Sequence, residues 1–207
     1  MSFITATNTE VLYCMPAPGA ALASSVTKSV ITANSTTNPA YQQPALNAIW
    51  PPDKLIGRAL RYVARGGVGT TATPTLQVQL YLDPTQNGTS GQILLGGTGA
   101  FTTASAIGGG ASMTANWELE LDVVITAVGV TGGAYNCTVY TSGIFTYGPG
   151  NDAATAVASG TYMIGSNTSK TTIVPGTAYW PEVWATWGTS NAANSIQCSQ
   201  FIAMGLT

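Results

Sequence analysis

The sequence predicts an all-β protein, an antiparallel β-sandwich of jelly-roll type. Apolar residues alternate with polar ones wherever the chain has a clear pattern, and no window shows a persuasive helical period. Glycine, proline, asparagine and serine interrupt the alternating segments at short intervals, as they do between antiparallel strands. A sheet with one apolar face has to cover that face, and a second sheet is the usual cover in such folds.

Residues 1–54 are predicted to form an extended N-terminal arm. They contain six prolines and show little periodicity. Ordering such a segment costs conformational entropy, so we expect a neighbouring subunit to hold it. Two short apolar pieces, at 10–15 and 28–33, are candidates for edge strands.

A jelly-roll domain is predicted over residues 55–207, and two of its strands alternate strictly. Residues 75–83 place four aliphatic side chains on one face and polar or tyrosine side chains on the other. Residues 116–126 place Trp117 and four aliphatic residues inward, whereas Glu118, Glu120 and Asp122 point outward. Both segments are predicted to be half-buried strands.

Weaker strands complete the prediction. Each is a short apolar segment bounded by turn-forming residues, and they lie at 55–65, 135–147, 162–165, 171–174, 178–187 and 195–204. The glycine- and alanine-rich stretches 96–110 and 147–159 are predicted to be loops. Residues 188–194 are expected to join the last two strands as a hairpin loop, with Cys198 in the core of the returning strand.

The composition excludes most enzyme mechanisms. The 207 residues include no histidine, which rules out Ser-His-Asp and Cys-His catalysis and every histidine-ligated metal site. The three cysteines are far apart and form no C-x-x-C pair, so neither a zinc site nor a disulfide framework is expected. We therefore expect no enzymatic activity and no cofactor.

Charged residues are scarce, which limits the partners. Only 7% of residues are charged, with six Lys and Arg against eight Asp and Glu. Binding to nucleic acid draws on many basic groups, so nucleic acid is not an expected partner. The sequence has no leader pattern and nothing near the ~20 apolar residues of a membrane span, so we expect synthesis in a cytoplasm and no membrane partner.

The outward carboxylates of residues 116–126 admit two interpretations. Glu118 and Glu120 would lie ~6.5 to 7 Å apart on a strand, near the separation of the acids in an inverting glycosidase. Alternatively, they pair with Arg58, Arg61 or Arg65 on a neighbouring strand or subunit. We favour the pairing, because a glycosidase also needs an aromatic cleft and an acid with a raised pKa. Calcium binding at the isolated Asp83 or Asp152 is not expected.

The tryptophans near the C-terminus also have two interpretations. Trp180 and Trp184 share one strand parity, and Trp187 has the other, so a regular strand points them to opposite sides. Exposed tryptophans would form a platform for host glycans, since aromatic faces suit sugar rings. Core or subunit interface is the interpretation we favour, because tryptophan is common in both.

Three segments together resemble a known group of proteins. They are LRYVARGGVGTTATPTLQVQLYLD at 60–83, WELELDVVITAVG at 117–129 and ATWGTSNAANSIQCSQFIA at 185–203. In order and over residues 55–205 they are similar to virion structural proteins of tailed bacteriophages.

This resemblance implies a jelly-roll protein of the capsid exterior, most like decoration or head-fibre proteins. Such proteins are usually homotrimers that bind the major capsid protein or other virion proteins, and no catalytic residue carries over. The expected function is therefore that of a capsid decoration (cement) protein located on the virion. The alternatives are a tail or baseplate component, or a host-glycan-binding module that uses Trp180 and Trp184.

Overall fold

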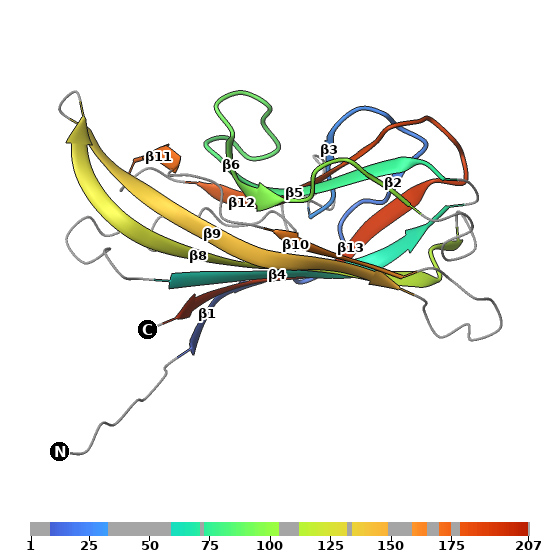
Figure 1. Ribbon diagram of the computed structural model, residues 1–207, viewed down its shortest axis with the longest axis horizontal. Helices are drawn as coiled ribbons and strands as arrows, with labels where there is room; N and C mark the ends of the chain where they lie inside the picture. Colours follow the sequence, from blue (N-terminus) through green and yellow to red (C-terminus); the bar gives the residue numbers. More distant parts are fainter. Residues whose placement is uncertain are drawn as a thin grey trace, which may run out of the picture.

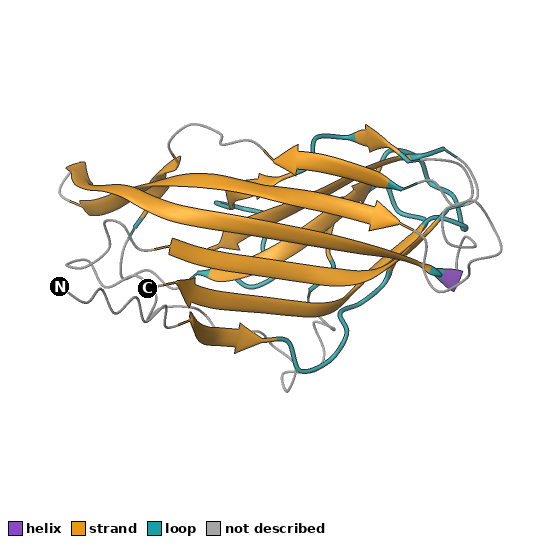
Figure 2. Cartoon of the chain, turned by 60° about the horizontal axis from the view of Figure 1, so that its bottom comes forward, coloured by secondary structure: helices purple, strands orange, loops and turns teal. Residues whose placement is uncertain are grey.

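The structure is a computed structural model, and it confirms the all-β prediction. It describes residues 9–32, 59–70, 73–103, 112–131, 134–148, 159–164, 170–174 and 179–206. In this part of the chain two antiparallel sheets pack face to face as a sandwich (Figures 1 and 2).

The larger sheet has the strand order β1-β13-β4-β8-β9-β10. Its strands are β1 (Thr9–Cys14), β13 (Ser195–Leu206), β4 (Ala59–Gly69), β8 (Ala115–Thr131), β9 (Ala134–Gly148) and β10 (Gly160–Ile164). Two short strands are added at the side: β2 (Leu22–Ala23) pairs with β13, and β11 (Lys170–Ile173) pairs with β9.

The smaller sheet has the strand order β3-β12-β5-β6. Its strands are β3 (Ser29–Val30), β12 (Trp180–Trp187), β5 (Thr75–Asp83) and β6 (Ile93–Gly97), with β7 (Phe101–Thr102) beside β5. Strands β6 and β7 had no counterpart in the sequence prediction, and they place parts of the predicted loop 96–110 in the sheet. The segment Ile93–Gly97 is short and ends in two glycines, so it lacks the alternation that marks a strand.

The pairing of the strands confirms the jelly roll. The ladders are nested: β1 pairs with β13, β3 with β12, β4 with β8, and β5 with β6, all antiparallel. The chain is therefore one long hairpin that has been rolled into two sheets, with the β5–β6 turn at its tip. Strands β9, β10 and β11 come between β8 and β12 in the sequence. They extend the larger sheet beyond β8.

Residues 9–32 of the segment expected to be an arm lie in the sandwich. Strand β1 pairs with β13 from Thr9 to Cys14, and β3 pairs with β12, so the edge-strand candidates are confirmed. Side chains from this segment join the core, namely Tyr13, Met15, Leu22 and Ile31. Without them, β12 and β13 would present unpaired edges and uncovered apolar side chains. The rest of residues 1–54 lies outside the described residues.

The core lies between the sheets and is built by the alternation of β5 and β8. Leu76, Val78, Leu80 and Leu82 are each at most 2% exposed. Trp117 and the four aliphatic residues that follow it on β8 are equally buried. The predicted inward faces of both strands are therefore confirmed.

A β-bulge changes the inward parity of β13. The register shifts between Cys198 and Gln200, so Ile196 and Cys198 point inward before the bulge and Phe201 and Ala203 point inward after it. The prediction that Cys198 lies in the core is confirmed, and its side chain is fully buried. The predicted hairpin is wrong, because residues 188–194 join β12 in the smaller sheet to β13 in the larger sheet, and these two strands do not pair. Cys14, in contrast, is exposed.

Candidate functional site

The outward carboxylates of β8 and the arginines of β4 lie side by side on the larger sheet. The antiparallel register places Arg61 opposite Asp122 and Arg65 opposite Glu118. Residues that face each other across a ladder point to the same side, so these side chains meet on the surface away from the core. Arg58, also a candidate, lies outside the described residues.

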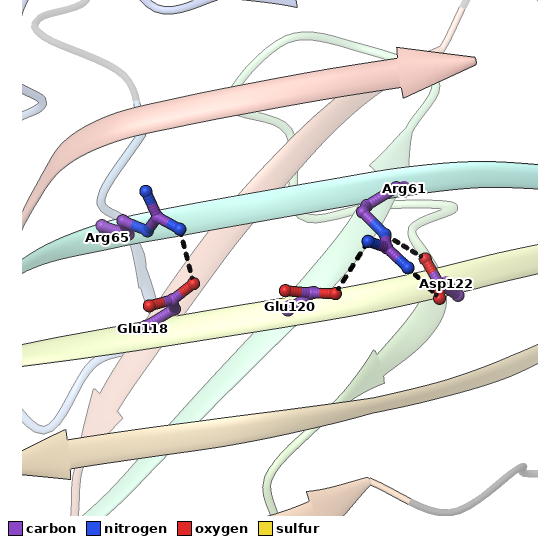
Figure 3. A network of polar contacts seen from close by, with 5 residues as sticks. All are labelled: Arg61, Arg65, Glu118, Glu120 and Asp122. Atoms are coloured by element: carbon purple, nitrogen blue, oxygen red, sulfur yellow. Dashed lines mark hydrogen bonds and ion pairs between the residues drawn. The ribbon is translucent and has the colours of Figure 1, made fainter. Parts of the chain in front are cut away.

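These residues form a network of ion pairs, which confirms the predicted pairing (Figure 3). The guanidinium of Arg61 donates from Nε to Asp122 Oδ1 at 2.7 Å and from Nη2 to Asp122 Oδ2 at 2.8 Å. Its Nη1 lies 3.2 Å from Glu120 Oε1. Arg65 Nη2 donates to Glu118 Oε1 at 2.8 Å. Glu118 and Glu120 therefore both form ion pairs with arginine. This arrangement gives no support to the interpretation of the two glutamates as the acids of a glycosidase.

Apolar side chains surround this network on the same surface. Val11 is 62% exposed, Tyr140 is 49% exposed and Met163 is 80% exposed. The ladders place Tyr140 opposite Val124 and Met163 opposite Ile144, and both partners are half-buried. We call this surface the outer face, and its residues are Val11, Ile202, Met204, Arg61, Val63, Arg65, Glu118, Glu120, Asp122, Val124, Tyr140, Ile144 and Met163.

Within the described part of the chain, two grooves lie at one end of the outer face. The larger has a volume of about 600 Å³ and is lined mostly by small and polar residues, namely Arg65, Gly66, Gly67, Ser112, Met113, Asn116, Gln197 and Ser199. The smaller, of about 350 Å³, lies between β8, β9 and β10 and shares Asn116 with it. A Cβ atom at Gly66 would lie 1.8 Å from the carbonyl oxygen of Gln197, so glycine is required where β13 approaches. The outer face is thus apolar around its ion pairs and polar at this end.

The tryptophans of β12 divide as their parity predicts. Trp187 is in the core with an exposure of 0%, whereas Trp184 points to the other side of the smaller sheet. Trp184 is nevertheless only 4% exposed, and the Lys28 ammonium lies 5.0 Å from its ring centroid. Its ring therefore offers no open surface to a sugar. Trp180 is half-buried and keeps some contact with solvent.

A second polar cluster lies on the outward side of the smaller sheet, and sequence reasoning missed it. Asp83 at the end of β5 is 0% exposed, and Glu182 on β12 is 1% exposed. Both lie beneath the β5–β6 turn, with Lys28 and Gln92 beside Asp83. The sequence does show that Glu182 lies on the same strand face as Trp180 and Trp184. That Asp83 is its neighbour becomes known only from the β5–β12 register.

The described part of the chain brings together no group of three His, Cys, Asp or Glu side chains that could hold a metal ion. A search of the same residues for a helix with the length and apolarity of a membrane span finds none.

Comparisons with known proteins give a distant likeness among solved structures. No protein-family model matches the chain, and no curated protein matches it. Among solved structures, it is similar to the CBM2 module of the evolved Dit of Lactobacillus casei BL23 phage J-1. The identity is 12%, the TM-score is 0.34, and the match covers 97% of each chain. A TM-score below one half does not establish a common fold, so function has to be argued from the residues themselves.

Proposed function

We propose that this chain is a bacteriophage virion structural protein, a capsid decoration protein that binds the outside of the assembled head. The resemblance of residues 55–205 to tailed-phage virion proteins supports the proposal. The jelly roll is compatible with it, but this fold carries many functions, so the surface has to bear the argument.

The observation that carries the proposal is the outer face. Large apolar side chains that stay in solvent are unfavourable and are typical of surfaces that another protein covers. Here Met163, Tyr140 and Val11 are exposed on one face, and the arginines beside them are already paired with carboxylates. A surface of this kind can be buried without leaving unpaired charges at its centre.

Binding of this kind stabilises a shell through non-covalent contacts, without a catalytic step. A protein that binds the assembled shell and not its free subunits shifts the assembly equilibrium by mass action. A homotrimer adds avidity, because three linked subunits contact the shell together. The partner in this proposal is the major capsid protein or another virion protein.

Binding to purified heads that lack this chain tests the proposed surface. Replacing Met163 with Asp places a charge at the contact, and we expect the affinity for heads in a pelleting assay to fall at least about ten-fold. Val26 is the matched control, because it is 52% exposed but lies outside the outer face, between β2 and β3. Equal binding by Met163→Asp and Val26→Asp would overturn the proposed surface.

Electron cryomicroscopy of the intact particle tests the location. We expect density for the jelly roll on the head exterior, and light scattering of the purified chain should give the mass of a trimer. Density on the tail and none on the head would replace the decoration role with that of a tail or baseplate component.

The glycan-binding alternative has one observation in its favour, the partial exposure of Trp180. It predicts that the wild type binds a glycan array and that Trp180→Ala loses the signal. Absence of any glycan signal from the wild type would end this alternative.

A further inference from the structure

Asp83 and Glu182 are neighbouring acids that are both withdrawn from solvent. The antiparallel register places Glu182 opposite Tyr81, so Asp83 is its diagonal neighbour on the same side of the sheet. The two residues are 0% and 1% exposed. Acidic side chains are buried to this degree only where their charge is compensated or absent.

The hydrogen bonds distinguish the two carboxyl groups. Asp83 accepts from the Thr85 amide at 3.2 Å and from Gln92 Nε2 at 2.7 Å. Glu182 accepts one bond, from the Asn87 amide to Oε1 at 2.9 Å. Its other oxygen, Oε2, is buried without a well-formed hydrogen bond to the described residues, and the Trp184 indole and the Asp83 carboxyl are the side chains that approach Glu182. Asp83 thus has the donors that suit a carboxylate, and Glu182 has an oxygen that lacks one.

Among the described residues, one cation, Lys28, lies beside the two acids. The Lys28 ammonium donates a hydrogen bond to Gln92 Oε1 and lies 3.5 Å from the Tyr81 ring centroid. It also interacts electrostatically with Asp83. A single additional proton therefore makes the cluster neutral. Burial, with a smaller effect from the charge of Asp83, raises the pKa of Glu182 to about 7 against the opposing effects of the Asn87 amide and the Trp184 indole. A proton on Oε2 would make this buried oxygen a hydrogen-bond donor.

The β5–β6 turn covers both acids. Asn87 contacts Glu182 through its amide, with a φ of 56° that a non-glycine residue seldom adopts. Gly88 packs against Asp83, since a Cβ atom there would lie 3.0 Å from Asp83 Oδ1. Glu182 can gain water around its charge only if this turn moves away from the sheet.

We propose that Glu182 holds a proton beneath the β5–β6 turn, next to Asp83, and that loss of this proton to solvent releases the turn. The charged and titratable groups facing the pair, among the described residues, are Lys28 and Tyr81. Burial raises the pKa of the Tyr81 phenol, so it stays neutral while Glu182 titrates. The turn is closed when Glu182 is protonated, and it opens as the pH rises through neutrality.

Carboxyl carbon shifts of ¹³C-glutamate-labelled protein measure the proton directly. The chain has four glutamates, and the resonance missing from Glu182→Gln identifies the one of interest. We expect that resonance to titrate with a midpoint near the pKa of about 7. Asp83→Asn removes the neighbouring charge and should lower the midpoint of the same resonance, which provides a second assignment if Glu182→Gln does not fold.

Amide hydrogen exchange measures the release of the turn. Between about pH 6 and about pH 8, exchange at Asn87 and Gly88 should accelerate at least about ten-fold beyond the base-catalysed increase. The reference is the Gly188 amide, which bonds to the Thr75 carbonyl oxygen at 2.8 Å away from this turn. Glu182→Gln should keep the turn protected at both pH values, whereas the matched control Glu118→Gln, in the ion-pair network, should behave like the wild type.

A Glu182 midpoint below about pH 5, near that of a free glutamate, would overturn the proposal. Exchange at Asn87 and Gly88 that follows the reference amide would do the same. Recovery of protection on addition of Ca²⁺ at about pH 8 would show that the oxygens take a metal ion instead of a proton.

Discussion

Arg61 holds Asp122 with two hydrogen bonds and Glu120 with a third contact, yet this geometry contributes little to stability. The Arg61 side chain is 38% exposed and that of Asp122 is 33% exposed. Water screens such pairs, and ordering a long side chain opposes the gain. The folded state is stabilised mainly by the burial of core side chains. The ion-pair network instead keeps the charges paired when a partner covers the outer face.

We expect Arg61→Ala to lower the free energy of unfolding by less than about 1 kcal/mol, because the pair is partly exposed. Phe145→Ala, at a residue of the core with 0% exposure, should lower it by about 3 to 5 kcal/mol through the cavity that it leaves. Urea denaturation measures both values. A loss for Arg61→Ala as large as that for Phe145→Ala would mean that the network is a major source of stability.

Two glycines near the end of β6 provide a matched pair of substitutions. Gly97 has a φ of 152°, and a Cβ atom there would lie 2.4 Å from the carbonyl oxygen of Val78. Gly99 has no heavy atom within 4 Å of such a Cβ. We expect Gly97→Ala to lower the free energy of unfolding by about 1 to 3 kcal/mol and Gly99→Ala to change it by less than about 0.5 kcal/mol. Equal melting temperatures for the two variants would contradict this assignment.

At the scale of residues, the sequence predicts what strand parity decides. Parity separates Trp187 from Trp184 and places Glu118 on the outer face, and the structure agrees, with Trp187 as the core residue. Parity does not predict that Trp184 is buried. Lys28 and strand β3 cover it, and both are far from it in the sequence. Nor does parity join Asp83 to Glu182, since their contact depends on the β5–β12 register.

At the scale of elements, β1 is an edge strand on which the core depends. Tyr13 packs against Phe201 with ring centroids 6.2 Å apart, and Met15 follows it into the core. The sequence makes β1 difficult to recognise, because six residues followed by prolines resemble an extended segment as much as a strand. Only the unpaired edge of β13 explains why this piece folds where it does.

Deletion of residues 1–15 should therefore expose the edge of β13 and the side of Phe201. We expect a lower melting temperature and self-association, measured by calorimetry and light scattering, because an unpaired edge recruits other strands. Deletion of residues 1–8 is the control, since it leaves β1 in place. A variant without residues 1–15 that stays as stable as this control would show that β1 is dispensable.

At the scale of the whole molecule, stability should fall in two steps as the pH rises. The pKa of Glu182 is raised from 4.5 to about 7 on folding, so the folded state holds a proton that the unfolded chain releases. This contribution is complete below about pH 4.5 and is lost as the pH reaches about 7, by an amount on the order of 3 kcal/mol. The second step comes from buried tyrosines and cysteines: burial raises the pKa of Tyr13 from 10.0 to about 12, and it also raises the pKa values of Tyr62, Cys137 and Cys198.

Denaturation curves across this pH range measure both steps. Glu182→Gln should remove the step below neutrality and leave the alkaline step unchanged. A wild type whose stability rises between about pH 5 and about pH 7 would contradict the assignment of the first step to Glu182.

The nested pairing of the strands also sets the order in which the chain can fold. The β5–β6 turn joins strands that are close in sequence, whereas Thr9 pairs with Leu206. Contacts between distant residues form late, because a long loop has to close first. During synthesis, β1 leaves the ribosome long before β13 exists, and its apolar side chains stay without their partner until the last strand emerges. We therefore expect the newly made chain to need protection by chaperones until the last strand emerges, more than a protein of local contacts would.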